Sequence, residues 1–415
     1  MKNLIIFSLV ISGIFLTAVE EEPVIIGKKI TLNSEIMQED REILLYLPGD
    51  YDTSVKNYPI LFHMQGSEIL FHKETGTIKY LSEFRTEIPQ MIVVNILFTN
   101  YRRDVFPRKL ERIPGTGGSD NFLDFIEYEL LPFLQENYRT TDHLTIYGQS
   151  NTGMFSLYAQ LSRPDLFDAC IASSPAVGQG NNFMYSLTDS LLSKSNFSNN
   201  KMFITHALDD PLKRIVGDAL PGYLQILEAK SLPELDWNYL EYENGGHCPP
   251  VSLHDGLVWL FSDWILPEEI RTESVQAIIS YAEELQSEYG IAPEISDIIE
   301  DVAFDLINSQ QYEKSYEYFH KLTELKPEEL LYHYQIGKIS AVSGLFTAEG
   351  ITSLEMYIAS EREDLNPSRS AACWRLGLIY EKMGDHSAAS SSYNMGLKLD
   401  PNDTYCAKAL EELEK

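Results

Sequence analysis

Between residues 24 and 264, short apolar runs alternate with stretches whose apolar residues recur at helical spacing. The apolar runs predict strands at Val24–Leu32, Ile43–Leu47, Ile60–His63, Met91–Leu97, Leu144–Tyr147, Ala169–Ala172, Met202–Thr205 and Trp237–Tyr242. The helical patterns cover Asp120–Asn137, Met154–Ser162, Tyr223–Lys230 and Leu253–Ile265. Strands that alternate with helices indicate a mostly parallel sheet covered on both faces. The first two strands have no helix between them, which favours an antiparallel start.

After Pro267 the strand-like runs end, and the pattern becomes helical throughout. The last part repeats itself with the spacing of a tetratricopeptide repeat, at Leu376, Gly377, Tyr380, Gly384, Ala389, Tyr393 and Pro401. One departure is Gly396, where alanine is usual. Gly337, Gly344 and Pro367 mark an earlier copy, and Ala303, Phe319 and Pro327 mark a more degenerate first one. Thr404–Leu413 is predicted to be the helix that covers the open end of the stack. We therefore expect an α/β domain over 24–265 and a helical repeat domain over 270–415.

The N-terminus has the pattern of an export signal. Lys2 supplies a positive charge, residues Leu4 to Ala18 are almost wholly apolar, and acidic residues begin at Glu20. The apolar stretch is short for a membrane span and fits a signal peptide over 1–18, with an uncleaved anchor as the alternative. The sequence thus predicts an exported protein, periplasmic or extracellular, with no membrane span once the signal is removed.

The charge balance narrows the set of partners. The chain has 32 Lys and Arg against 62 Asp and Glu, a formal net charge of -30 spread along its length. Such a chain is repelled by nucleic acid and by anionic membranes, so we expect neither as a partner. Its four cysteines make no disulfide framework, although a bridge between Cys373 and Cys406 stays open. No spacing resembles a zinc site, and we expect no metal or cofactor.

The candidate nucleophile is Ser150, in the run Gly148-Gln149-Ser150-Asn151-Thr152-Gly153. The run joins a predicted strand to a predicted helix. A serine on such a sharp turn, called a nucleophile elbow, is exposed above the end of the sheet. The backbone N–H of Asn151 would then face the site as an oxyanion donor. The alternative is an ordinary serine at the start of a helix.

A histidine and a carboxylate are available in the order that such a serine requires. His247 follows the last predicted strand within Glu243-Asn244-Gly245-Gly246-His247, and His254 is its rival. The acid is expected after Met202–Thr205, where Asp210 is the first choice and Asp209 the second. Asp218, Glu228 and a dyad without an acid stay open, and Asp210 before Pro211 could simply begin a helix.

Two further loops belong to the same expected edge of the sheet. The loop Met64-Gln65-Gly66-Ser67 should supply a second oxyanion donor, the backbone N–H of Ser67 or Gly66. The run Arg102-Arg103-Asp104 could order the site or bind an acidic group of a substrate, although an internal ion pair is the favoured interpretation.

These pieces together resemble the esterase family that includes esterase D, ferric-enterobactin esterases, feruloyl esterases and the mycobacterial mycolyltransferases. The resemblance covers roughly residues 24–265. It rests on the elbow and on the segments 117–122, 125–127, 129–133, 137–140, 163–167 and 172–175, with Asn100, Arg102, Asp104 and Pro107 in the loop after the fourth strand. It implies an α/β-hydrolase fold with Ser150 as nucleophile, His247 as base and an acid near Asp210.

Three residues depart from the pattern of that family. Thr152 replaces the usual elbow glycine, Gln149 a usual histidine, and Gln65 the aspartate that usually precedes the glycine of the oxyanion loop. The sequence therefore predicts a serine esterase that cleaves a small-molecule ester, with slow or lost turnover left open. An acyltransferase is the near variant. A hydrolase scaffold without turnover, which binds a protein partner through its repeats, is the alternative from another class.

Overall fold

The structure, a computed structural model, describes residues 23–230, 232–413 and 415. Its centre is one eight-stranded sheet with the order β1-β2-β4-β3-β5-β6-β7-β8. The strands are β1 (Lys28–Ser34), β2 (Glu39–Tyr46), β3 (Tyr58–His63), β4 (Ile92–Ile96), β5 (Thr140–Gln149), β6 (Ala169–Ser173), β7 (Asn200–Ala207) and β8 (Leu235–Tyr242). β1 and β2 pair antiparallel to their neighbours, and β4, β3, β5, β6, β7 and β8 run parallel to one another. The predicted mixed architecture is confirmed.

Helices cover both faces of the sheet. They are α1 (Glu68–Lys79), α2 (Tyr101–Val105), α3 (Ser119–Phe125), α4 (Leu131–Asn137), α5 (Asn151–Ser162), α6 (Gln179–Leu192), α7 (Leu220–Lys230) and α8 (Ser252–Leu260), with π-helical turns η1 (Tyr80–Phe84) and η2 (Ile126–Leu130). Gly256 of α8 packs on Ile171 of β6, whereas α5 packs closely against Gly148, which pairs with Ala172. Because successive strand residues point to opposite faces, α5 and α8 lie on opposite sides of the sheet.

Several predicted boundaries were wrong. The first strand begins at Lys28 rather than Val24, and Val24 and Ile25 are exposed. The last helix of the α/β part ends at Leu260 rather than Ile265. Two helices of the α/β part, α1 and α6, were not among the predicted ones. The predicted signal peptide lies outside the described residues.

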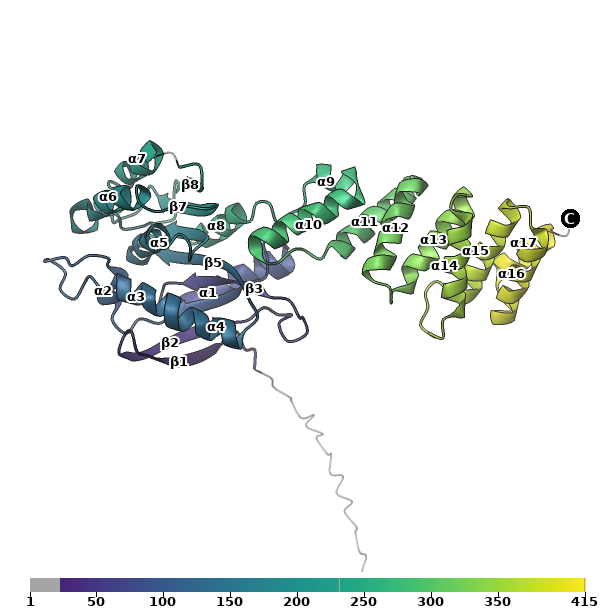
Figure 1. Ribbon diagram of the computed structural model, residues 1–415, viewed down its shortest axis with the longest axis horizontal. Coiled ribbons are helices and arrows are strands. Elements are labelled where there is room, and N and C mark those ends of the chain that lie inside the picture. Colours follow the sequence, from purple (N-terminus) through teal and green to yellow (C-terminus); the bar gives the residue numbers. More distant parts are fainter. Residues whose placement is uncertain (1–22, 231, 414) are drawn as a thin grey trace, which may run out of the picture.

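The C-terminal part is a row of helices, as the repeats predict (Figure 1). They are α9 (Glu268–Glu273), α10 (Val275–Tyr289), α11 (Ile295–Asn308), α12 (Tyr312–Leu325), α13 (Leu330–Ser343), α14 (Thr347–Ala359), α15 (Arg369–Lys382), α16 (His386–Leu399) and α17 (Thr404–Leu413). Gly337 and Gly377 sit where a side chain would collide with Leu354 and Tyr393 of the partner helix. These glycines let the two helices of a repeat approach closely. Gly396 likewise leaves room for the sulfur of Cys406.

Helix α10 belongs to two cores: Ile278 in its first half packs with the repeats, whereas its last turns pack with the sheet. Leu285, Tyr289 and the following Ile291 belong to the same buried cluster as the strands. Lys201, near the start of β7, donates to the hydroxyl of Tyr289 at 3.0 Å, and Tyr289 donates to Asp263 at 2.7 Å. These contacts join the row of helices to the edge where β5 and β7 begin.

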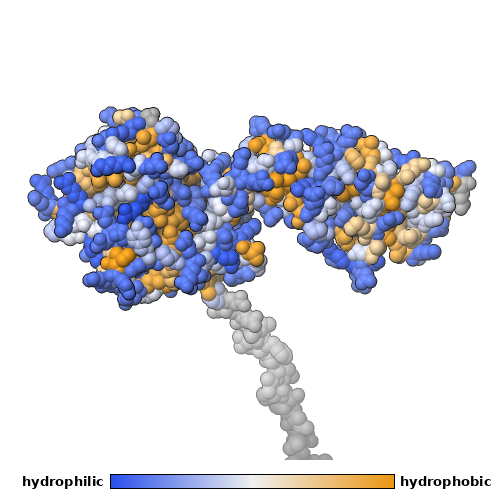
Figure 2. Space-filling model, in the orientation of Figure 1, coloured by the Kyte–Doolittle hydropathy of each residue, from blue (hydrophilic) through white to orange (hydrophobic). Residues whose placement is uncertain are grey.

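Hydrophilic surface dominates the face shown in Figure 2, with apolar patches over both the sheet part and the helical row. Among the described residues, no helix is both long enough and apolar enough to span a lipid bilayer.

Replacing Tyr289 by alanine should destabilise the sheet part, although Tyr289 belongs to α10 of the helical row. The side chain is 1% exposed, and deletion of a large buried aromatic costs about 3–5 kcal/mol. Urea denaturation followed by tryptophan fluorescence measures the loss. Tyr128, which is 61% exposed, is the matched control, and its alanine variant should change the midpoint little. Equal small effects of both substitutions would contradict the shared core.

Candidate functional site

Ser150 lies on the turn between β5 and α5 with a positive φ of 56° and a ψ of -120°. Its N–H donates to the carbonyl of Ser173 at the end of β6, at 2.9 Å, and its own carbonyl accepts from Ala176 at 3.0 Å. Gly148 lies so close to Thr152 that any side chain there would collide with the helix. The turn therefore places Ser150 just beyond the carboxyl end of β5, where the residue is partly exposed.

His247 and Asp210 face each other across the ends of β7 and β8. The Nδ1 atom of His247 lies 2.8 Å from Oδ2 of Asp210. The Asp210 side chain is 1% exposed, and its other oxygen accepts from the N–H of Leu212 at 2.8 Å. This carboxylate is therefore fixed, and it can fix the tautomer and orientation of the imidazole.

The other candidates lie elsewhere. Asp209 accepts from the N–H of Gly246 at 2.8 Å and so holds the loop that carries the histidine. His254 pairs with Asp255 on α8. Asp218 and Glu228 are exposed. Among the described residues, Asp210 is the carboxylate in contact with the His247 ring.

The serine turn and the histidine loop are both anchored to the end of β6. Ser173 accepts from the N–H of Ser150, and the hydroxyl of the next residue, Ser174, accepts from the N–H of Cys248 at 3.1 Å. Within the described part of the chain, the Ser150 hydroxyl and the His247 ring do not form a hydrogen bond with each other. Catalytic hydrogen bonds are often long without a substrate and tighten when one binds.

Cys248 follows the histidine, and its surroundings keep its thiol protonated at neutral pH. Burial, with the nearby charge of Asp210 second, raises the pKa of its thiol to about 12. A thiol with such a pKa remains protonated, and the thiolate is the nucleophilic form.

Three backbone N–H groups are available for an oxyanion. In the described structure, those of Gly66, Ser67 and Asn151 donate to no other group of the chain. Gly66 has a φ of 59°, and a Cβ on it would lie 2.8 Å from the ring of Phe98. A glycine is therefore required there, and it turns the backbone of this loop toward the elbow.

Thr152 fits the elbow although a glycine is usual there. Its side chain is 1% exposed, and its hydroxyl accepts from the N–H of Gln149 at 2.9 Å and donates to the carbonyl of the same residue at 2.8 Å. The threonine thus bonds both backbone polar groups of the residue before Ser150. Gly153, one position later, packs against the carbonyls of Gly148 and Ser173.

The arginines after β4 form an internal ion-pair network. Arg41 is fully buried and pairs with Asp104 and Glu39, each at 2.8 Å. Arg103 binds the same two carboxylates, and its hydrogen bond lowers the pKa of Glu39 to about 2. The favoured interpretation of Arg103 and Asp104 is therefore correct, whereas Arg102 is exposed.

Two buried ionisable groups beneath the site had no signal in the sequence. His63, the last residue of β3, is fully buried and stacks on Tyr147 with ring centroids 5.5 Å apart. Burial, and secondarily the charge of Lys73, lowers its pKa to about 3. Glu74 of α1 is also fully buried, bonds Lys73 at 3.0 Å and the Gln149 side chain at 3.4 Å, and its pKa is raised by burial.

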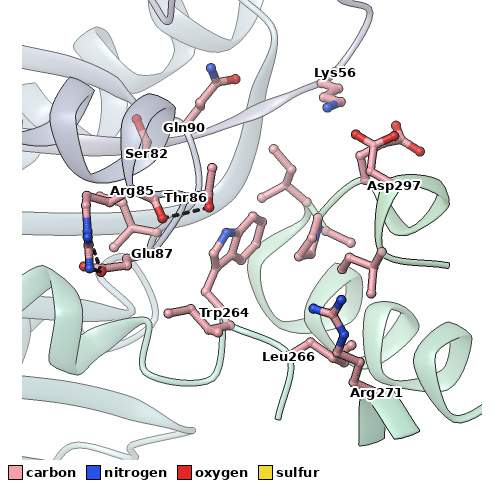
Figure 3. Close-up of a pocket in the computed structure, with 17 residues that line it drawn as sticks. Lys56, Ser82, Arg85, Thr86, Glu87, Gln90, Trp264, Leu266, Arg271 and Asp297 are labelled. Carbon is pink, nitrogen blue, oxygen red and sulfur yellow. Dashed lines mark hydrogen bonds and ion pairs between the residues drawn. The ribbon is translucent and has the colours of Figure 1, made fainter. Parts of the chain in front are cut away.

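A cavity of about 690 Å³ lies away from this chemistry, at the junction of the sheet part and the helical row. Its wall includes Arg85 on one side, Lys56, Asp297 and Arg271 on the other, and Trp264 between them (Figure 3). None of the predicted catalytic residues lines it. Its size therefore says nothing about where the reaction occurs.

Comparison with known families supports both halves of the prediction. Residues 34–210 match the family model described as Putative esterase, and residues 370–403 match a model of the tetratricopeptide repeat. The chain resembles this esterase family with tetratricopeptide repeats at its C-terminus.

Two curated relatives match parts of the chain. The ferri-bacillibactin esterase BesA of Bacillus subtilis is 30% identical over 138 residues, which cover 32% of this chain and 48% of the relative. A siderophore triacetylfusarinine C esterase of Aspergillus fumigatus is 42% identical over 65 residues, which cover 15% of this chain and 22% of the relative. The chain thus spans less than half the length of either relative.

Two solved structures share the architecture. An IroE-like serine hydrolase from Shewanella oneidensis has a TM-score of 0.61 and 24% identity. The match covers 72% of this chain and 99% of that hydrolase. An uncharacterised protein from Capnocytophaga ochracea has a TM-score of 0.57 and 16% identity. The match covers 94% of this chain and 99% of that protein. The fold is therefore an α/β-hydrolase fold followed by an all-α repeat region.

Acid should destabilise the protein through His63, the buried histidine at the end of β3. The unfolded chain binds a proton on His63 below about pH 6.5, whereas the folded chain does so only near pH 3. Stability is therefore lost as the pH falls between these values, by up to about 1.4 kcal/mol per pH unit.

The His63→Phe variant should lose about 2 kcal/mol less than the wild type between pH 7.5 and 5. Urea midpoints at the two pH values measure the difference. His320→Phe, whose parent side chain is 54% exposed, should retain the wild-type dependence. An unchanged dependence in His63→Phe would show that this histidine is not the cause.

Proposed function

We propose that the protein is a serine hydrolase that cleaves carboxylic esters at Ser150. The observation that carries the proposal is the positive-φ backbone at Ser150, together with a histidine that is bonded to a buried carboxylate and whose loop is anchored to the same strand end as Ser150. A non-glycine residue adopts such a backbone at a cost, and strained residues of this kind cluster at active sites. The resemblance to the esterase family supports the same assignment.

The proposed reaction passes through an acyl-enzyme. His247 removes the proton of Ser150 as the hydroxyl attacks the ester carbonyl, and Asp210 stabilises the imidazolium that forms. The N–H groups of Asn151 and of Ser67 or Gly66 would bind the negative oxygen of the tetrahedral intermediate. His247 returns the proton to the leaving alcohol, and water then releases the acyl group by the same steps.

The class of substrate comes from the relatives rather than from the geometry. Both curated relatives are named for siderophore esters, so we propose the ester bonds of a siderophore as the first natural substrates to test. An acyltransferase would use the same residues with an alcohol in place of water. The repeats are proposed to bind a protein partner, because that is the common use of such arrays, and export remains a prediction.

Ser150→Ala should lower kcat toward p-nitrophenyl acetate and butyrate by about three or more decades, since the nucleophile is lost. The same variant should lose labelling by a fluorophosphonate probe. Ser162→Ala, at the end of α5, removes a hydroxyl that bonds only within its own helix. This variant should keep the wild-type kcat and the labelling by the probe. Equal turnover and labelling of wild type and Ser150→Ala would exclude Ser150 as the nucleophile.

Two adjacent aspartates allow a matched test of the acid. Asp210→Asn should lower kcat by about 10³–10⁴, because the amide no longer holds the imidazole in its reactive tautomer. Asp209→Asn should lower it far less, since Asp209 bonds the backbone of Gly246. Steady-state kinetics on the same ester, with melting temperatures as a check on folding, compares the two. A larger loss in Asp209→Asn would reassign the acid.

A further inference from the structure

The two departures from the family pattern that touch the proposed catalytic centre are in contact with each other. The side-chain amide of Gln65 donates to the hydroxyl of Thr152 at 3.0 Å. Gln65 belongs to the loop that carries the free N–H groups of Gly66 and Ser67, and Thr152 belongs to the elbow. One hydrogen bond therefore joins the two sides between which an oxyanion would lie.

The Thr152 hydroxyl is fully used in this arrangement. It gives its hydrogen to the carbonyl of Gln149 and accepts from the N–H of Gln149 and from the amide of Gln65. A hydroxyl has one hydrogen and two lone pairs, so no hydrogen-bonding capacity remains. The partner at position 65 must consequently be a donor.

This requirement explains why the two departures occur together. The aspartate of the resembled family has no hydrogen to donate when it is ionised, and its side chain is one methylene shorter than that of glutamine. A glutamine supplies the donor, and Thr152 supplies the acceptor that a glycine lacks. Each residue would be mismatched with the usual residue at the other position.

We propose that Gln65 and Thr152 form a positioning pair that fixes the oxyanion loop relative to Ser150, an inference that rests on the proposed function. Neither side chain touches the reacting atoms in this scheme. Thr152 holds both backbone groups of Gln149, the residue before the nucleophile, and Gln65 ties the opposing donors to it. Loss of the pair should therefore slow the chemical step and leave the binding of substrate nearly unchanged.

A double-mutant cycle tests the coupling. Gln65→Met keeps the length of the side chain and removes the donor, and Thr152→Val keeps the shape and removes the hydroxyl. Each single variant should lower kcat toward p-nitrophenyl butyrate by about tenfold to a hundredfold, as expected for a small displacement of catalytic groups. KM should stay within about threefold. Gln65→Met should have no further effect in the Thr152→Val background, because the bond is already absent.

Two further variants separate positioning from a general loss of structure. Thr152→Ser keeps the hydroxyl and should keep most of the activity. Thr75→Val is the matched control, because Thr75 is 1% exposed and bonds only to carbonyls of its own helix, α1. Its kcat should equal that of the wild type, and the melting temperature of every variant checks that it is folded.

The outcomes distinguish this inference from the proposed function. If the wild type neither turns over esters nor labels with a fluorophosphonate probe, the proposed function fails and the pair has nothing to position. If the wild type is active but Gln65→Met has the same effect in both backgrounds, or none in either, the pair is overturned and the esterase assignment stands. Rates of probe labelling at Ser150 should follow the same pattern as kcat.

Discussion

The site depends on the backbone conformation of Ser150. A positive φ at a residue with a side chain costs roughly 1–3 kcal/mol, so the surroundings must enforce it. The end of β6 does so from one side, because Ser173 accepts from the N–H of Ser150 and Ala176 donates to its carbonyl. From the other side, α5 packs onto Gly148 with no room for a side chain. The sheet and the helix together therefore set where the hydroxyl points.

Sequence periodicity was sufficient for the elements that are apolar and regular. All eight strands were predicted, because each contains an apolar run. The elbow serine and the histidine loop were predicted because they come after such runs. Helix α1 was missed since its buried residues are Phe71, Glu74, Thr75 and Ile78, half of which are polar. Helix α6 was missed because positive φ values at Gly180, Asn181 and Asn182 interrupt its first turns, and those residues read as a loop.

What the sequence could not provide is the direction of side chains and the membership of a core. Asp209 and Asp210 are adjacent and chemically identical, and only the three-dimensional structure shows which one contacts the imidazole. The burial of Arg41 and His63 depends on strands that are distant in sequence. Helix α10 has the periodicity of any amphipathic helix, and nothing in that period tells that its first half packs on the repeats and its last turns on the sheet. The contact between Gln65 and Thr152 spans 87 residues and is likewise invisible to local patterns.

The attachment of α10 sets where the repeats lie relative to the proposed site. Tyr289 packs on His143 near the start of β5, with ring centroids 5.1 Å apart, whereas Ser150 follows the other end of that strand. Nine residues of extended chain separate Thr141, beside Gly290, from Ser150, which corresponds to about 30 Å. The repeats extend away from the edge where β5 begins (Figure 1). A protein bound along them would therefore approach from the opposite edge of the sheet to the proposed nucleophile.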